Sequence, residues 1–134
     1  MLPLVFDSLL KLHSLVFKNE LLDWLDEIEA EILSWEGTSV SLHKYGGLQF
    51  NYKGVEIGHL HSNGLLDILY NRILKQQFML QGRISPHHVF KDSGWISFYI
   101  ETDNDVKYAK ELLSVAYHKI AGPPQKEGSL AEES

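Results

Sequence analysis

The hydrophobic pattern changes period near Gly37, and this change limits the possible folds more than any other feature. Before Gly37, apolar residues recur at helical spacing. From Val40 onward they alternate with polar residues over short stretches separated by Gly-containing turns, which is typical of strands joined by hairpins. A helical period returns after Thr102. This order predicts an α+β domain, an antiparallel sheet with helices packed on one face.

Two helices are expected at the N-terminus and one at the C-terminus. The first, Leu2–Phe17, is apolar on nearly all sides, so it needs cover from the core or from a second subunit. The second is capped by Asn19 and stopped by Gly37, and its apolar face contains Leu21, Leu25, Ile28, Ile32 and Trp35. The last is capped by Thr102, Asp103 or Asn104, and its expected buried residues are Val106, Ala109, Leu113, Ala116, Tyr117 and Ile120.

Short elements are expected between these helices. Lys53-Gly54 predicts a turn between two paired strands, and Trp95–Ile100 predicts a further strand. Tyr70–Leu80 is expected to be helical and to end at Gly82. Arg83–Phe90 contains Pro86, which favours a short edge strand.

The length of 134 residues fits a single domain. We expect this domain to span residues 1–120, with an N-terminal helical pair at 2–36 and a core at 38–120. Residues 121–134 contain Gly-Pro-Pro followed by mostly polar or small residues, a composition that predicts a disordered tail.

Composition excludes several function classes. The chain has no cysteine, so disulfide scaffolds, thiolate zinc sites and cysteine nucleophiles are excluded. A net charge of −6 argues against a nucleic-acid partner, because binding phosphates needs a basic surface. Neither a signal-peptide pattern nor a membrane-spanning apolar run is visible, so no membrane partner is expected and the expected location is the cytoplasm.

Two histidine motifs carry the densest chemical signal. In a strand, His59 and His61 of Gly58-His-Leu-His61 would point to the same face. His87 and His88 would point to opposite faces, so at most one of them can join the pair. Converging imidazoles are suited to a divalent transition metal, with His59 and His61 as the first ligands. A nearby carboxylate could complete the site: strand parity points Glu56 away, which favours Asp67.

The next strand offers a second wall for such a site. Trp95, Ser97 and Tyr99 share one face, while Ile96, Phe98 and Ile100 share the other, which is expected to be core. The polar face could line a pocket with histidine partners, or it could lie under a helix. Gly94 suggests a turn or a close approach. No phosphate-binding loop or serine nucleophile motif is present.

Several motifs together resemble the luciferase-domain family, which is named for the fungal luciferases. They occur in order as Gly46–Phe50, Glu56–His61, Gly64–Asp67, Gly82, His87-His88, Ser93–Trp95 and Leu112–Tyr117. The order of elements is also similar, more weakly, to YjbR-like proteins. The family resemblance implies that residues 38–120 form a luciferase-domain-like core. Fungal luciferases oxidise a hispidin-type pyrone with molecular oxygen and need no protein-bound redox cofactor. By resemblance, His59, His61, His88 and Trp95 would line the pocket, with a histidine as the base.

Two functions are therefore expected as alternatives. In the first, the protein binds a small organic ligand, or acts on it by acid/base or oxidative chemistry, at a histidine-rich pocket. His59, His61 and His88 would be catalytic, and Trp95, Tyr99, His87 and Asp67 would bind the ligand. In the second, the protein is a non-catalytic interaction module with structural histidines, whose first helix docks a partner or forms a homodimer.

Overall fold

The computed structural model describes residues 20–42, 46–87 and 91–124. These residues form three helices and a six-stranded antiparallel sheet, so the predicted α+β class is confirmed. The first described helix covers residues 20–33. The other elements are β1 (Thr38–Leu42), β2 (Leu48–Tyr52), β3 (Val55–Leu60), β4 (Leu65–Leu69), α2 (Arg72–Met79), β5 (Ser85–Pro86), β6 (Trp95–Tyr99) and α3 (Asp103–Ala121).

The sheet has the strand order β1-β2-β3-β4-β6-β5, and the described pairs are antiparallel. Lys53 and Gly54 both have positive φ, as a two-residue type I′ hairpin between β2 and β3 requires. The chain leaves β4 through α2 and the short strand β5, and then returns as β6 between β4 and β5. The expectation of an edge strand at Pro86 is correct.

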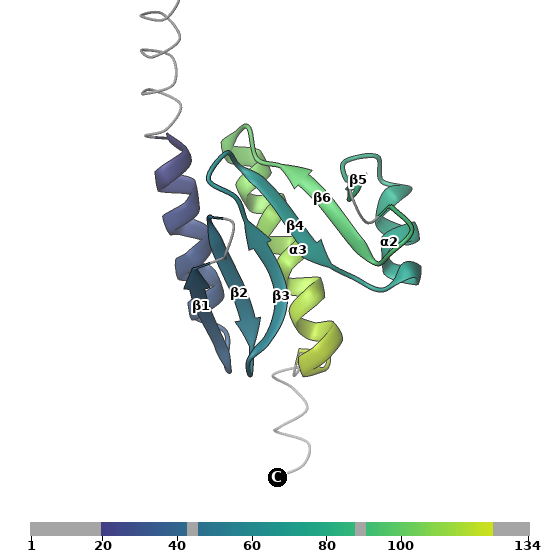
Figure 1. Ribbon diagram of the computed structural model, residues 1–134, viewed down its shortest axis with the longest axis horizontal. Coiled ribbons are helices and arrows are strands. Elements are labelled where there is room, and N and C mark those ends of the chain that lie inside the picture. The colour runs from purple at the N-terminus through teal and green to yellow at the C-terminus, as the bar shows by residue number, and fades with distance from the viewer. Residues whose placement is uncertain (1–19, 43–45, 88–90, 125–134) are drawn as a thin grey trace, which may run out of the picture.

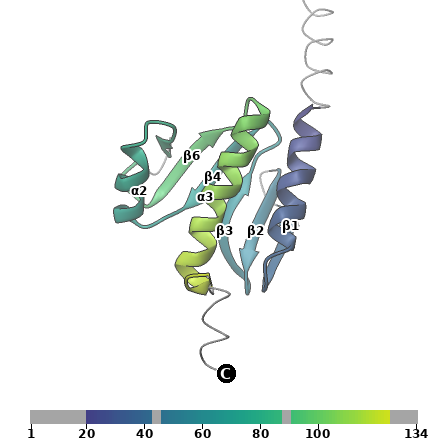
Figure 2. The same cartoon turned by 180° about the vertical axis from the view of Figure 1, so that it is seen from behind.

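Helix α3 and the helix of residues 20–33 lie on one face of the sheet. Figures 1 and 2 show α3 and the helix of residues 20–33 side by side behind β1 to β4. The core between the helices and the sheet includes Phe50, Ile57, Leu60, Ile68, Ile96, Leu112 and Leu113, each fully buried. The opposite face of the sheet is not covered by a described helix, and His59, His61 and His87 lie there.

Helix α3 begins with a capping box. Thr102 accepts a hydrogen bond from the backbone N–H of Asp105, and the Asp105 side chain accepts one from the backbone N–H of Thr102. Thr102 is therefore the cap among the three candidates. The predicted buried face is correct except at Ile120, which is 39% exposed near the end of the helix. Tyr108 and Leu112 are also buried.

The helix of residues 20–33 buries one apolar side. Leu21, Ile28 and Ile32 are buried as expected, while Leu25 and Trp35 are only partly buried. Trp24 was not expected in the core; its Nε1 donates to Asp103 Oδ1 at 2.6 Å, which ties this helix to the start of α3.

Of the two expected N-terminal helices, the described residues contain one. The Leu2–Phe17 helix and the Asn19 cap lie outside the described residues, as do residues 125–134 of the expected tail. Helix α3 itself continues to Ala121. Among the described helices, none combines the length and apolar character needed to cross a membrane.

Helix α2 is shorter than expected because Asn71 caps it. The Asn71 side chain accepts a hydrogen bond from the backbone N–H of Leu74 at 2.8 Å, and residues before it belong to the end of β4 and its exit. Gly94 confirms the expected close approach, since a Cβ at this position would collide with the carbonyl oxygen of Tyr70.

Candidate functional site: a histidine–aspartate cluster

A polar row crosses the uncovered face of the sheet. The register places His59 of β3 opposite Asp67 of β4, and Asp67 opposite Ser97 of β6. Gln49 of β2 continues the row on the other side of His59. Residues directly opposite one another in an antiparallel pair share a face, so these side chains all project away from α3.

Within the described residues, three imidazole rings lie close to the same carboxylate oxygen of Asp67. Asp67 Oδ2 lies 2.8 Å from His61 Nε2, 3.2 Å from His59 Nε2 and 3.5 Å from His87 Nε2. The other carboxylate oxygen, Oδ1, accepts a hydrogen bond from Ser97 Oγ at 2.5 Å. Asp67 is thus the centre on which residues from three other parts of the chain converge, and we call His59, His61, Asp67 and His87 the His/Asp cluster.

Glu56 also belongs to this region, and the expectation that it points away is wrong. Its Oε2 lies 2.6 Å from His59 Nδ1, where the ring N–H donates to the carboxylate. The cause is a bulge between β2 and β3: Phe50 pairs with Gly58, but Asn51 pairs with Glu56. The extra residue, Ile57, shifts the alternation, so Glu56 returns to the face that carries His59.

Trp95 lies beside the imidazoles. Its ring centroid is 5.4 Å from that of His59 and 6.2 Å from that of His87. The rings of His59 and His61 are 4.9 Å apart and nearly perpendicular. The indole therefore packs against one side of the cluster.

The cluster is buried at its centre and is most exposed at His61. The Asp67 side chain is 1% exposed, His87 is 8% exposed and His59 is 12% exposed, whereas His61 is 27% exposed. A ligand from solvent would therefore reach the cluster at His61. The described ligand atoms of His59, His61 and Asp67 lie within 4.8 Å of one another, close enough for one ion to contact all three.

Burial and charge act on the cluster in opposite directions. Burial alone would lower the pKa of His59, but the hydrogen bonds to Asp67 and Glu56 and the two carboxylate charges outweigh it and raise the pKa to about 9. Burial alone would raise the pKa of Asp67. Hydrogen bonds from His59, Ser97 and His61, with the charge of His87, instead hold the pKa of Asp67 well below its usual range.

The structure brings together most of the residues predicted from the sequence. His59, His61, His87 and Asp67 meet, and Trp95 contacts two of the imidazoles. Tyr99 lies on the same face of β6 but is 56% exposed, and no contact described for it reaches the cluster. His88 lies outside the described residues.

Two residues of the site were missed or misplaced by the sequence reasoning. Ser97 was grouped with Trp95, but its bond to Asp67 depends on β6 pairing with β4, which no local pattern indicates. Glu56 was placed on the wrong face because strict alternation ignores bulges. Nothing in the spacing between Glu56 and His59 indicates a bulge.

The fold and this cluster define a small α+β protein whose antiparallel sheet carries a His/Asp centre on its uncovered face. A comparison with protein families identifies it further, because residues 54–116 match the family model of the luciferase domain. This match supports the resemblance to the luciferase-domain family that the motifs predict. The matched residues contain His59, His61, Asp67 and His87. The weaker similarity to YjbR-like proteins is not shown, and no curated protein or solved structure matches the chain.

Proposed function

We propose that this protein binds a divalent transition metal at the His/Asp cluster and uses the site for acid/base chemistry on a small organic ligand. The observation that carries the proposal is the convergence of three imidazole Nε2 atoms on one carboxylate oxygen of Asp67. Imidazole nitrogens and a carboxylate oxygen are the donors that zinc and related ions take in proteins.

The surroundings of the cluster fit this donor set. His59 uses Nδ1 to donate to Glu56, which leaves Nε2 as its ligand atom. Such an outer carboxylate fixes the ring and increases the basicity of the liganding nitrogen. Ser97 orients Asp67 by donating to Oδ1, so that Oδ2 faces the imidazoles. His59, His61 and Asp67 would hold the ion, with His87 as a fourth ligand.

When bound, a divalent ion supplies a Lewis acid that lowers the pKa of a coordinated water or hydroxyl. The chain's own residues would do the rest. Trp95 packs against one side of the cluster, and the exposed edge of His61 admits the ligand. Zinc has no redox chemistry, so a zinc ion agrees with the resemblance to fungal luciferases, which need no protein-bound redox cofactor.

A second candidate is a metal-free proton-transfer site. It is favoured by the raised pKa of His59, which leaves this imidazole protonated at neutral pH between two carboxylates. His61 would then be the base, oriented by Asp67 Oδ2 at 2.8 Å. The interaction-module alternative depends on the Leu2–Phe17 helix, which lies outside the described residues, and it stays a prediction.

The first test is elemental analysis of the purified protein, followed by calorimetric titration of the metal-stripped protein with Zn²⁺ and Co²⁺. We expect about one ion per chain, held by the cluster. His61→Ala should lose more affinity than the roughly 10–100-fold that an outer-shell change costs, because it removes a ligand.

His118→Ala is the matched control. His118 lies in α3, where its Nδ1 contacts the carbonyl oxygen of Gly122 rather than the cluster. Its removal should leave metal affinity unchanged. If the stripped protein takes up neither ion, or if both variants bind like the wild type, the metal proposal is wrong. Loss of turnover of a small ligand in His61→Ala without any metal uptake would favour the proton-transfer candidate.

A further inference from the structure

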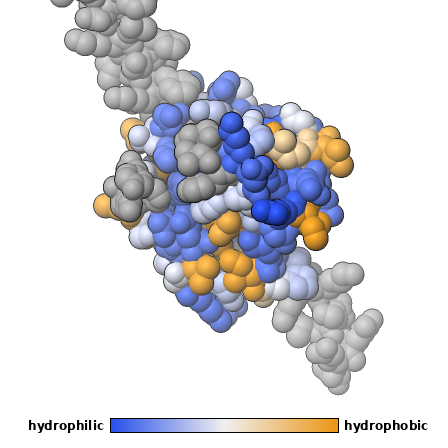
Figure 3. All heavy atoms as spheres, turned by 45° about the vertical axis from the view of Figure 1, so that its right-hand side comes forward, coloured by the Kyte–Doolittle hydropathy of each residue, from blue (hydrophilic) through white to orange (hydrophobic). Residues whose placement is uncertain are grey.

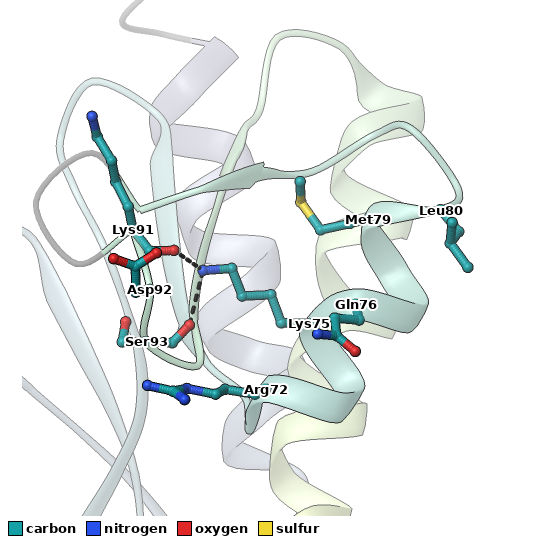
Figure 4. Close-up of a pocket in the computed structure, with 8 residues that line it drawn as sticks. All are labelled: Arg72, Lys75, Gln76, Met79, Leu80, Lys91, Asp92 and Ser93. Atoms are coloured by element: carbon teal, nitrogen blue, oxygen red, sulfur yellow. Dashed lines mark hydrogen bonds between the residues drawn. The ribbon is translucent and has the colours of Figure 1, made fainter.

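A hollow of about 810 Å³ lies between α2 and the segment that precedes β6, away from the His/Asp cluster. Figure 4 shows Arg72 and Lys75 reaching from α2 toward Lys91, Asp92 and Ser93. Figure 3 brings this side of the molecule forward and shows strongly hydrophilic residues next to hydrophobic ones. The lining accordingly combines three cationic side chains with one carboxylate and the apolar Met79 and Leu80.

Lys75 is the unusual residue of this hollow. It is only 8% exposed, although lysine is rarely buried without a partner of opposite charge. Its Nζ donates to the carbonyl oxygens of Lys91 at 2.5 Å and Ser93 at 2.8 Å, both of which are neutral acceptors. These bonds satisfy two of the three ammonium hydrogens and do not neutralise the charge.

Within the described residues, no carboxylate forms an ion pair with the cations of this hollow. Asp92 lines the hollow, but none of the ion pairs between described residues joins it to Arg72, Lys75 or Lys91. A buried charge without a counter-ion is costly, and an anion that enters the hollow would remove that cost.

We propose that this hollow binds a small organic anion, with its carboxylate or phosphate group between Arg72 and Lys75 and its apolar part against Met79. Arg72 is exposed and starts α2, so its guanidinium can form paired hydrogen bonds with either head group. The partly buried Met79 supplies the apolar contact. This site is independent of the His/Asp cluster.

The test is an NMR titration of the ¹⁵N-labelled full chain with four probes: inorganic phosphate, butyl phosphate, acetate and butanoate. Saturable shifts are expected at the amides of 72–79 and 91–93. The butyl-bearing probe should bind several-fold tighter than its small counterpart, because it buries methylene groups. Comparing the two phosphates with the two carboxylates identifies the preferred head group.

Two variants decide whether the binding belongs to the hollow. Arg72→Gln removes one cation from an exposed position and should weaken binding by at least about fivefold. Lys107→Gln removes the same charge from the exposed side of α3 and should bind like the wild type. His61→Ala should also bind like the wild type. Absence of saturable shifts with all four probes, or equal weakening in the Arg72 and Lys107 variants, would overturn the proposal.

Discussion

At the scale of single residues, Asp67 organises the candidate site. Its Oδ2 faces three imidazoles and its Oδ1 is held by Ser97, while 99% of its side chain is removed from solvent (1% exposed). A buried carboxylate is stable only when it is paired and hydrogen-bonded, and Asp67 meets both conditions. Its neighbours in turn depend on it, because His61 has its hydrogen bond to the same oxygen.

Glu56→Gln tests the outer shell of the site. The amide keeps the size of Glu56 but removes its charge, so the pKa of His59 should fall below about 9. The orientation of the His59 ring should also become less fixed. Metal affinity is expected to fall roughly 10–100-fold. NMR titration of His59 and calorimetric metal titration measure the two effects.

Gln49→Glu is a control for the Glu56 variant. Gln49 sits opposite His59 across β2 and β3, but its amide nitrogen donates to Asn51 Oδ1. A new carboxylate there should raise the pKa of His59 further or leave it unchanged. An unchanged pKa of His59 in Glu56→Gln would contradict the assigned hydrogen bond.

At the scale of elements, the β3 bulge and the α3 cap show how local structure prepares the site. The bulge at Ile57 places Glu56 and His59 on one face. The capping box at Thr102 starts α3 directly after β6, and α3 then supports β2, β3 and β4 from behind. The strands that carry the cluster therefore rest on a helix whose starting point is defined by its own side chains.

Thr102→Ala should destabilise the protein by about 1 kcal/mol, because the backbone N–H of Asp105 loses its side-chain acceptor. Urea unfolding measures the change in the free energy of unfolding. Asn104→Ala, two residues into the same turn and exposed, should change it by less than about 0.5 kcal/mol. Equal effects of the two substitutions would show that Thr102 is not the cap.

At the scale of the whole molecule, one face of the sheet contributes to stability and the other carries the candidate site. One face packs the helices and the apolar core, and the other carries the polar row from Gln49 to Ser97. Figure 1 views the sheet from this uncovered side. The site is therefore built into the scaffold, and its protonation contributes to the stability of the fold.

The metal-free protein should lose stability on the alkaline side. The pKa of His59 is about 9 in the folded state and near its ordinary 6.5 in the unfolded chain. The folded state binds this proton more tightly, so the stabilisation is complete below about pH 6.5 and is lost as the pH rises through 9. Urea unfolding in the presence of a chelator should show a fall of about 1–3 kcal/mol between these limits.

His59→Gln removes the titrating group and should flatten this pH dependence. His118→Ala should retain it, because His118 lies outside the cluster. A wild-type protein whose unfolding free energy is constant from pH 6.5 to 9 would rule out a strongly paired His59.

The sequence by itself determined the α+β class, the alternation of β6, the buried side of α3 and the shared face of His59 and His61. These features follow from periods of 3.6 and 2 along a single element, so they are local. Only the tertiary structure decided that Glu56 shares the face of His59, that Ser97 holds Asp67 and that His87 rather than a nearer residue completes the cluster. Those contacts depend on strand order and register, which join residues up to 30 positions apart. A single inserted residue such as Ile57 changes them without leaving a sign in the local pattern.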